Sequence, residues 1–289
     1  NAPYLETDST AAENNNQNWM QSVNTDGFTT GISEHTNSNS GSSYVAWQWK
    51  ANGGTTASNT DGNITSTVQA NQDAGFSIQT LTSASSGTSN WGHGLGQKPD
   101  WWVVKITGSG GGGWWLHHKS LNSGTSSQYL GLNSTAAATN LSAFDASSST
   151  ITASADFVAN SKTMVCYAFV EKQGYSKFGS YVGNGNADGT FIYTGFKPAF
   201  IMVKTTAVTD EWNMFDNKRS GFNPNNDAIY ASSVVAEDAG STYAFMDMVS
   251  NGFKLRRATH SPNKASTYIY MAFAENPFVT STGVPTTAR

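Results

Sequence analysis

The sequence predicts an all-β protein built from tandem antiparallel β-sandwich domains, jelly-roll-like and each of about 100 residues. Three observations predict it: the composition, a long internal repeat and a series of short strand-like runs. Charged residues make up only 12 % of the 289 residues, aromatic residues also make up 12 %, and 28 residues are Gly. Few Leu, Glu, Lys and Arg residues disfavour helices, while Thr, Tyr and Trp with Gly- and Ser-rich turns favour strands.

An internal repeat divides the chain into copies of one unit. The aligned residues Lys105 and Lys204 stand 99 positions apart, which is the length of a domain rather than of a solenoid repeat. The recurring segments are residues 4–12, 129–137 and, more weakly, 229–237; residues 96–101 and 195–200; residues 25–28 and 250–253; and residues 44–49, 164–169 and 268–273.

The repeat predicts the domain boundaries. Residues 1–59 correspond to the back half of a first copy, residues 60–170 to a second copy, residues 171–278 to a third, and residues 279–289 to a Thr- and Ser-rich tail. We expect a front half of the first copy upstream of residue 1. Six strand-like runs fill each whole copy, and in the third copy they are residues 178–182, 199–204, 211–216, 228–232, 252–256 and 267–275.

The last run of each copy alternates large apolar side chains with smaller or mixed ones. Because side chains alternate between the two faces of a strand, this pattern predicts one strongly apolar face in a core, with the other face against a further layer. The apolar-face residues are Val45, Trp47 and Trp49; Val165, Tyr167 and Phe169; and Ile269, Met271 and Phe273.

Two other runs, residues 101–104 and 200–203, are apolar at every position. A strand without alternation must be covered on both faces. A second sheet covers one face, and a neighbouring domain or subunit must cover the other. Trp101, Trp102, Phe200 and Ile201 are therefore candidate interface residues, and the pattern predicts a homo-oligomer.

Charge and composition argue against several classes of partner. The formal net charge is −4, and the longest basic run is residues 254–257. We therefore expect no nucleic-acid partner, which would require a basic surface. No stretch approaches 18 consecutive apolar residues, so we expect no membrane insertion. Cys166 is the only cysteine and cannot form an intrachain disulfide.

The sequence contains no recognisable catalytic, metal or cofactor motif. His117 and His118 are adjacent, so on a strand they point to opposite faces and cannot chelate one ion together with His93. The Gly-rich run over residues 108–113 lacks the Lys-Ser/Thr ending of a phosphate-binding loop. Cys166 lies in an apolar run, where a thiol is usually inert. We therefore expect a protein that is not an enzyme and carries no metal or cofactor.

Aromatic residues beside polar loops are the candidate ligand contacts. Trp91, Trp114 and Trp115 flank Gly- and Ser-rich segments, and Trp212 lies among acidic residues that include Asp216. Exposed aromatic rings beside Asn, Ser and Asp can stack on sugars and bond their hydroxyls. The alternative for the tryptophans is a place in the core, and the alternative for Asp216 is an ion pair with a neighbouring basic residue.

Four longer segments carry a resemblance to a known family. Residues 8–13, 44–54, 174–181 and 268–278 resemble a repeat family of structural proteins from marine tailed bacteriophages. Members are long virion proteins of the tail-fibre or capsid-appendage type. The resemblance spans nearly the whole chain and implies a role in the virion, without catalytic residues.

The expected function is that of a non-enzymatic phage virion protein, assembled in the host cytoplasm and exposed outside the cell. The leading interpretation is a homotrimeric tail fibre or spike that contacts a host-surface glycan or other receptor, next to other virion proteins. The alternative is a capsid decoration or head-fibre protein that reinforces the shell or projects from it. A third interpretation is a polysaccharide depolymerase that uses Asp216.

Overall fold

The computed structural model describes residues 3–16, 18–25, 27–33, 35–38, 41–51, 54–121, 127–158, 160–239, 244–279 and 285–286. These residues form several antiparallel β-sheets with one short helix, α1 (Ala155–Val158). The expected all-β, sandwich-type fold is confirmed. Most of the tail expected over residues 279–289 lies outside the described residues, apart from the pairing of β22 (Phe278–Val279) with β23 (Pro285–Thr286).

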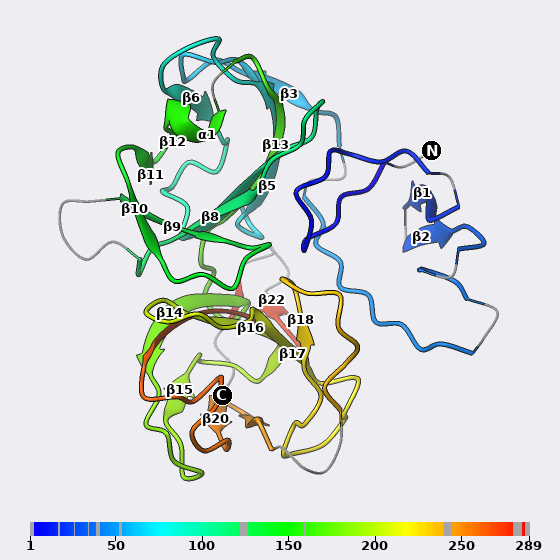
Figure 1. Ribbon diagram of the computed structural model, residues 1–289, viewed down its shortest axis with the longest axis vertical. Coiled ribbons are helices and arrows are strands. Elements are labelled where there is room, and N and C mark those ends of the chain that lie inside the picture. Colours follow the sequence, from blue (N-terminus) through cyan, green and yellow to red (C-terminus); the bar gives the residue numbers. More distant parts are fainter. Residues whose placement is uncertain are drawn as a thin grey trace.

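The first sandwich follows residue 56 and contains one large and one small sheet (Figure 1). The large sheet has the strand order β10-β9-β8-β7-β13-β5-β4-β3, and the small sheet has the order β11-β12-β6. The strands are β3 (Ala57–Asn59), β4 (Ser66–Asn71), β5 (Phe76–Thr82), β6 (Ser89–Gly92), β7 (Trp101–Ile106), β8 (Trp114–His118), β9 (Ser127–Gly131), β10 (Thr139–Leu141), β11 (Phe144–Ala146), β12 (Thr150–Ala153) and β13 (Thr163–Phe169).

The second sandwich has the same topology. Its large sheet has the order β14-β21-β16-β17-β18, which matches β5-β13-β7-β8-β9, and its small sheet β19-β20-β15 matches β11-β12-β6. The repeat seen in the sequence is therefore a repeat of the fold. The strands are β14 (Ser176–Val182), β15 (Phe191–Tyr193), β16 (Pro198–Thr205), β17 (Asn213–Asp216), β18 (Ile229–Tyr230), β19 (Met246–Val249), β20 (Gly252–Leu255) and β21 (Thr267–Ala274).

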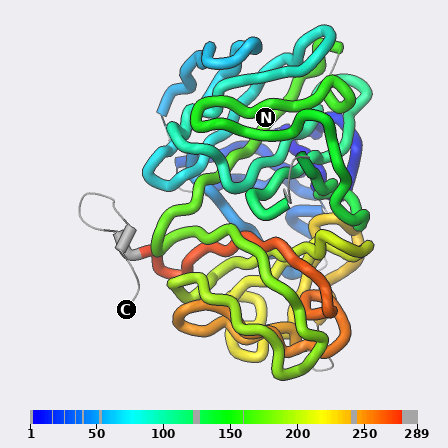
Figure 2. Tube along the Cα trace, turned by 90° about the vertical axis from the view of Figure 1, so that its left-hand side faces the viewer, coloured from blue at the N-terminus to red at the C-terminus, as the bar shows by residue number. Residues whose placement is uncertain are grey.

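The two sandwiches contain three apolar cores: one inside each sandwich and one between them. One core lies between the sheets of the first sandwich, around Trp102 and Phe144. A second lies between the sheets of the second sandwich, around Phe215 and Phe253. The third, which we call the shared core, joins the large sheets of both sandwiches, so that the two bodies stack one on the other (Figure 2). Strands β7 and β16 are thereby covered on both faces, which accounts for their unbroken apolar runs.

The N-terminal part lies beside both sandwiches (Figure 1). Its hairpin consists of β1 (Met20–Asn24) and β2 (Gly27–Thr30). Residues 41–50 follow and do not form a strand, although the sequence predicts one over residues 44–49. The expected alternation is nevertheless present, because Val45, Trp47 and Trp49 are half-buried and the residues between them are exposed. The equivalent strands β13 and β21 are each paired on both sides by strands of the front half of their own copy.

None of the described helical residues forms a helix of the length and apolar character needed to cross a lipid bilayer.

Candidate functional site

The tryptophans predicted as ligand contacts lie mostly in packed interiors. Trp91 is fully buried between the sheets of the first sandwich. Trp114 and Trp212 are 4 % and 2 % exposed and belong to the shared core. Trp115 is half-buried and stacks on Phe157, with ring centroids 4.8 Å apart. A sugar can stack only on an open ring face, so burial excludes the first three as sugar contacts in this structure.

Asp216, the acid predicted beside Trp212, is a buried turn anchor. Its side chain is 2 % exposed and forms an ion pair with Arg219, whose Nε lies 2.6 Å from Oδ2. The other oxygen, Oδ1, accepts the backbone N–H groups of Lys218 and Arg219, each at 2.9 Å. These bonds hold the turn that follows β17. The carboxylate is fully engaged away from any open surface, so it is not placed to protonate or attack a polysaccharide.

The four candidate interface residues divide among three cores inside one chain. Trp101 and Phe200 face the shared core, and Trp102 and Ile201 face the cores of their own sandwiches. The second face of each strand is thus covered by the neighbouring sandwich. These strands consequently provide no evidence for an oligomer.

The predicted ligand contact Trp114 belongs instead, together with Lys105, to a contact between copies, which we call joint 1. Residues 4–13 of the first copy lie against β7 and β8 of the second copy. Four hydrogen bonds cross the joint, and all of the acceptors are backbone carbonyl groups. The bonds run from Trp114 Nε1 to Glu6 O (2.8 Å), from Lys105 Nζ to Ser9 O (3.2 Å), from Gly112 N to Thr10 O (2.8 Å) and from Glu13 N to Thr107 O (2.9 Å).

Joint 2 links the second copy to the third through the equivalent residues. Residues 129–138 lie against β16 and the segment that leads into β17. Four hydrogen bonds again end on backbone carbonyl groups. They run from Trp212 Nε1 to Gly131 O (2.8 Å), from Lys204 Nζ to Thr135 O (3.2 Å), from Asp210 N to Thr135 O (2.9 Å) and from Ala138 N to Thr206 O (2.9 Å).

The lysines of the two joints are unusual because both are fully buried. Burial disfavours the charged amine, and it lowers the pKa of Lys204 to about 8, although Asp210 and Glu211 act in the opposite direction. Burial also lowers the pKa of Lys105. Each ammonium group is held by carbonyl oxygens, including Gly112 O at 2.6 Å from Lys105 Nζ. Such a buried lysine is retained only where its donors are satisfied.

Equivalent aromatic residues of all three copies meet in the shared core. Trp49, Phe169 and Phe273 occupy the same position in the three last runs. Their ring centroids lie 6.3 Å (Trp49 to Phe169), 5.3 Å (Trp49 to Phe273) and 5.7 Å (Phe169 to Phe273) apart, all in edge-on geometry. Edge-to-face pairs at these distances are favourable. Equivalent residues of all three copies therefore meet at one place in the shared core.

His118 adds a buried polar contact between the sandwiches. Its Nε2 lies 3.1 Å from the Tyr270 carbonyl in β21, and its Nδ1 accepts the N–H of Ser120 at 3.0 Å. Both nitrogens are thus used by a neutral ring that carries its proton on Nε2. Burial lowers the pKa of His118 to about 3.

The remaining histidines and the cysteine also have structural surroundings. His93 and His117 are buried, and each has a ring nitrogen beside a backbone carbonyl, Ser147 O and Gln128 O respectively. Cys166 is buried, and burial raises the pKa of its thiol. The described part of the chain contains no group of three His, Cys, Asp or Glu side chains that could hold a metal ion.

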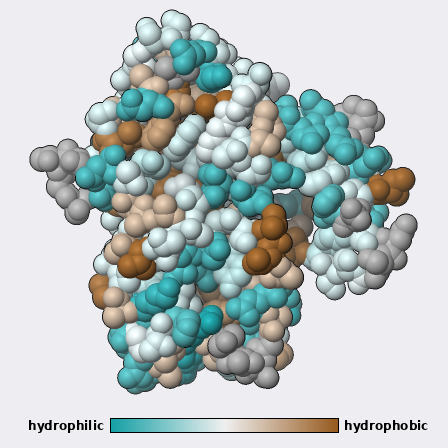
Figure 3. Space-filling view, viewed as in Figure 1, coloured by the Kyte–Doolittle hydropathy of each residue, from teal (hydrophilic) through white to brown (hydrophobic). Residues whose placement is uncertain are grey.

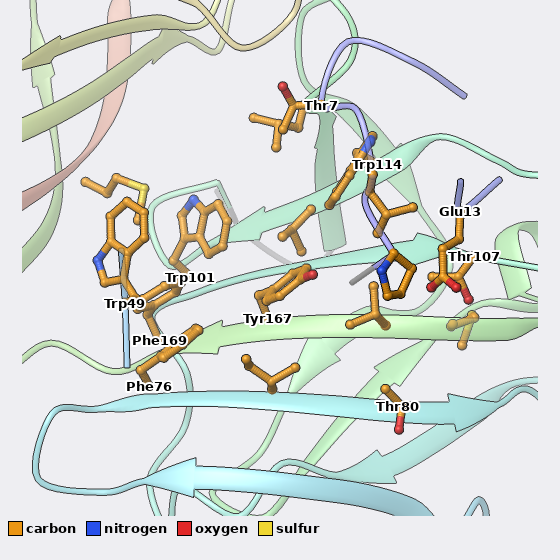
Figure 4. A pocket seen from close by; sticks show the side chains of 18 of the residues that line it. Thr7, Glu13, Trp49, Phe76, Thr80, Trp101, Thr107, Trp114, Tyr167 and Phe169 are labelled. Atoms are coloured by element: carbon orange, nitrogen blue, oxygen red, sulfur yellow. The ribbon is translucent and has the colours of Figure 1, made fainter. Parts of the chain in front are cut away.

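One apolar cavity of about 660 Å³ adjoins joint 1 (Figure 4). Trp49, Trp101, Trp114 and Tyr167 point into it from several segments, and Glu13 lies at its edge. Cavities of this size and character are typical of binding sites. Joint 1 is thus less completely packed than the rest of the shared core.

The sequence contains a signal for the joints. The segment Ser-Thr-Ala-Ala and the aligned lysines recur together, and the structure brings each such segment onto the lysine of the next copy. The segment and its lysine lie about 70 to 100 residues apart, as the two lysine bonds show. Their contact was therefore not evident from local patterns.

Comparison with known proteins gives one match. Residues 1–277 match the model of a family described as a domain of unknown function, DUF7483. No curated protein and no solved structure matches the chain.

Proposed function

The chain belongs to the DUF7483 family, and we propose that it is a non-enzymatic structural protein of a phage virion. The observation that carries the proposal is the pair of equivalent joints. The side chains of Trp114 and Trp212 and of the two buried lysines donate hydrogen bonds to backbone carbonyl groups of the preceding copy. The repeated polar residues therefore serve assembly of a single rigid block.

The construction of the joints suits a particle that meets seawater salt. Surface ion pairs weaken as ionic strength rises, because mobile ions screen them. Apart from an ion pair between Lys264 and Asp210 at joint 2, the joints rely instead on buried bonds to carbonyl groups and on the shared aromatic core. We expect the block to keep its stability at high salt, which unfolding in urea with and without 0.5 M NaCl, about the salt level of seawater, would test.

The packing of the copies bears on the position in the virion. In a tail fibre or spike, repeats strung in a row would present spaced contacts to the host and gain from avidity. Here the copies lie side by side around one core. This arrangement favours the capsid-decoration role over the tail-fibre role. Immunogold labelling of virions tests the choice: label on the head supports decoration, and label on the tail supports the fibre.

We propose that exposed aromatic residues of this chain make the contact with the host surface. Tyr193 is 64 % exposed at the edge of a groove that also contains Glu171, Gln173 and Lys177. This set offers a ring face with polar groups beside it, which suits a sugar. We expect binding to a glycan array to be lost in Tyr193→Ala and kept in Phe222→Ala, a matched change at another exposed ring. Equal binding by both variants would remove this site.

The molecular mass of the native particle in solution tests the proposed homotrimer. Light scattering coupled to chromatography gives about three chains per particle if the trimer forms. A particle of one chain would contradict the homotrimer.

A further inference from the structure

The cavity beside joint 1 combines an apolar interior with a single charged group. Among the described residues that line its volume of about 660 Å³, Glu13 alone is charged. Trp49, Trp101 and Tyr167 contribute aromatic rings, and most of the other lining side chains are apolar. A volume of this size can bury most of a small organic molecule, and an apolar lining with a few polar groups is typical of such binding sites.

The polar groups lie toward one end of the cavity (Figure 4). Trp49 and Trp101 lie at the opposite end, and the hydroxyl of Tyr167 points toward the end that holds Glu13. Burial raises the pKa of Tyr167, and Cys166 and the nearby Glu13 carboxylate raise it further. In the part of the chain that the structure describes, the Glu13 carboxylate has no ion-pair partner and the Tyr167 hydroxyl has no hydrogen-bond partner. Both groups are therefore available to a bound molecule.

Joint 2 has apolar side chains in the places of these two polar groups. Glu13 corresponds to Ala138, because each donates its backbone N–H at the same point of its joint, and Tyr167 corresponds to Met271. Ala138 and Met271 both pack in the shared core. A half-buried hydroxyl without a partner costs free energy, which a ligand that bonds to it would recover. The carboxylate and the hydroxyl thus occur in the joint that is open and not in the joint that is packed.

The charge at the cavity favours a cationic ligand. An anion would meet the Glu13 carboxylate without a cation among the described lining residues. The ammonium group of Lys105 lies 5.6 Å from the ring centroid of Trp114, but it is bound to backbone carbonyl groups and does not line the cavity. Glu13 is exposed, so a cation beside it stays in contact with water and avoids the cost of burying a charge.

The apolar part of such a ligand has its match inside the cavity. Pro3, Leu5 and Thr7 line the cavity from the N-terminal part of the chain. The face of this part that Figure 3 shows is mostly hydrophilic. An apolar molecule therefore finds more complementary surface in the cavity than on this outer face.

We infer that the cavity binds a small organic cation, an alkyl or aromatic amine, with its apolar body against Trp49 and Trp101 and its ammonium group beside Glu13 and the Tyr167 hydroxyl. The ammonium group donates to the carboxylate and to the hydroxyl oxygen. The apolar body fills the space that is open beside Trp114. The ligand thereby completes the packing of joint 1, at a site separate from the groove beside Tyr193.

The probe for the test is decylammonium, and decanoate, which has the same chain length and the opposite charge at pH 7, is its control. Isothermal titration calorimetry of the full chain, below the concentrations at which either forms micelles, should show one decylammonium per chain. Its affinity should exceed that of decanoate at least ten-fold. Glu13→Gln should lower the affinity for decylammonium about ten-fold and remove the preference over decanoate, through loss of a charge-assisted bond.

Two further variants locate the site. Glu6→Gln changes the net charge by the same amount on the same segment, but Glu6 does not line the cavity, so the affinity should be unchanged. Ile78→Phe fills part of the cavity with the residue of the equivalent position, Phe178. It should bind decylammonium several-fold more weakly, and the ligand should raise its melting temperature less than that of the original chain.

Three results would overturn the inference. Absence of decylammonium binding to a cooperatively melting chain would exclude the site. Equal affinities for decylammonium and decanoate, or an unchanged affinity in Glu13→Gln, would show uptake of any apolar chain without recognition of the ammonium group. Dimers of the chain that neither amphiphile affects, with slowed amide exchange around the cavity, would assign its opening to a second copy of the chain.

Discussion

Joints 1 and 2 share three equivalent hydrogen bonds, and the lysine of each bonds to a carbonyl group of the same segment, but the joints differ in what surrounds them. Joint 2 is closed by an ion pair between Lys264 and Asp210 at 2.5 Å, and its lysine has a pKa lowered to about 8. Joint 1 opens onto the 660 Å³ cavity instead. The bonding pattern is thus set by the repeat, whereas the packing around it depends on which neighbour is present. Predictions that treat the joints in pairs test this distinction.

The largest expected difference comes from truncating the two tryptophans. Trp212→Ala should lower the free energy of unfolding by about 3–5 kcal/mol, because it opens a cavity in a packed core and removes a buried bond. Trp114→Ala should lower the free energy of unfolding by at least about 1 kcal/mol less than Trp212→Ala, because Trp114 already borders a cavity. Urea unfolding of both variants measures the difference, with Trp115→Ala as a half-buried control. Equal losses at the two tryptophans would contradict the distinction between the joints.

Lowering the pH should destabilise the folded chain through His118, which links the second copy to the third. Among the described residues, no equivalent histidine links the first copy to the second. The folded pKa of His118, about 3, lies below the usual 6.5. Between these values the unfolded chain binds more protons, so the stability contribution is complete above pH 6.5 and is lost as the pH falls towards 3. We expect a loss of about 2–4 kcal/mol over this window.

The measurement is urea unfolding at several pH values for the original chain and His118→Gln. His117, Lys119 and Glu171 also act on this ring, and Lys119→Gln serves as a control that should retain the acid sensitivity. If His118→Gln destabilises the chain yet keeps the same pH slope, another group is responsible.

Part of this architecture could be predicted from the sequence. Composition and periodic runs predicted the all-β sandwich, and the unbroken apolar run that begins at Trp101 predicted strands covered on both faces. The burial of Trp114 and Trp212 could not be predicted from the sequence. Gly- and Ser-rich neighbours suggested open loops, but both rings are covered by segments distant in the sequence, around Glu6 and Gly131. The composition around a residue indicates how flexible its loop is, but not whether a segment distant in the sequence packs over its side chain.

The two lysines should respond differently to alkaline pH. The folded pKa of Lys204, about 8, lies below the 10.5 of an unperturbed lysine. Between these values the unfolded chain binds more protons, so stability should rise by about 1–2 kcal/mol from pH 8 towards pH 10. Lys204→Met should remove this rise, while Lys105→Met should reduce it less. A rise that survives in Lys204→Met would exclude this lysine as its source.

The smallest expected effect concerns the feature that the joints share. Trp114→Phe and Trp212→Phe each keep a ring in place but remove an Nε1–H that donates to a carbonyl at 2.8 Å. Because the two bonds have the same length and type of acceptor, the lost bond should cost about 1 kcal/mol in each joint. The rest of each variant's loss should reflect packing and be larger in joint 2. A double variant should show additive losses, since the tryptophans bond to separate segments and share no partner. Non-additive losses in urea unfolding would mean that the joints communicate through the shared core, and that the bonding pattern and its surroundings are not independent.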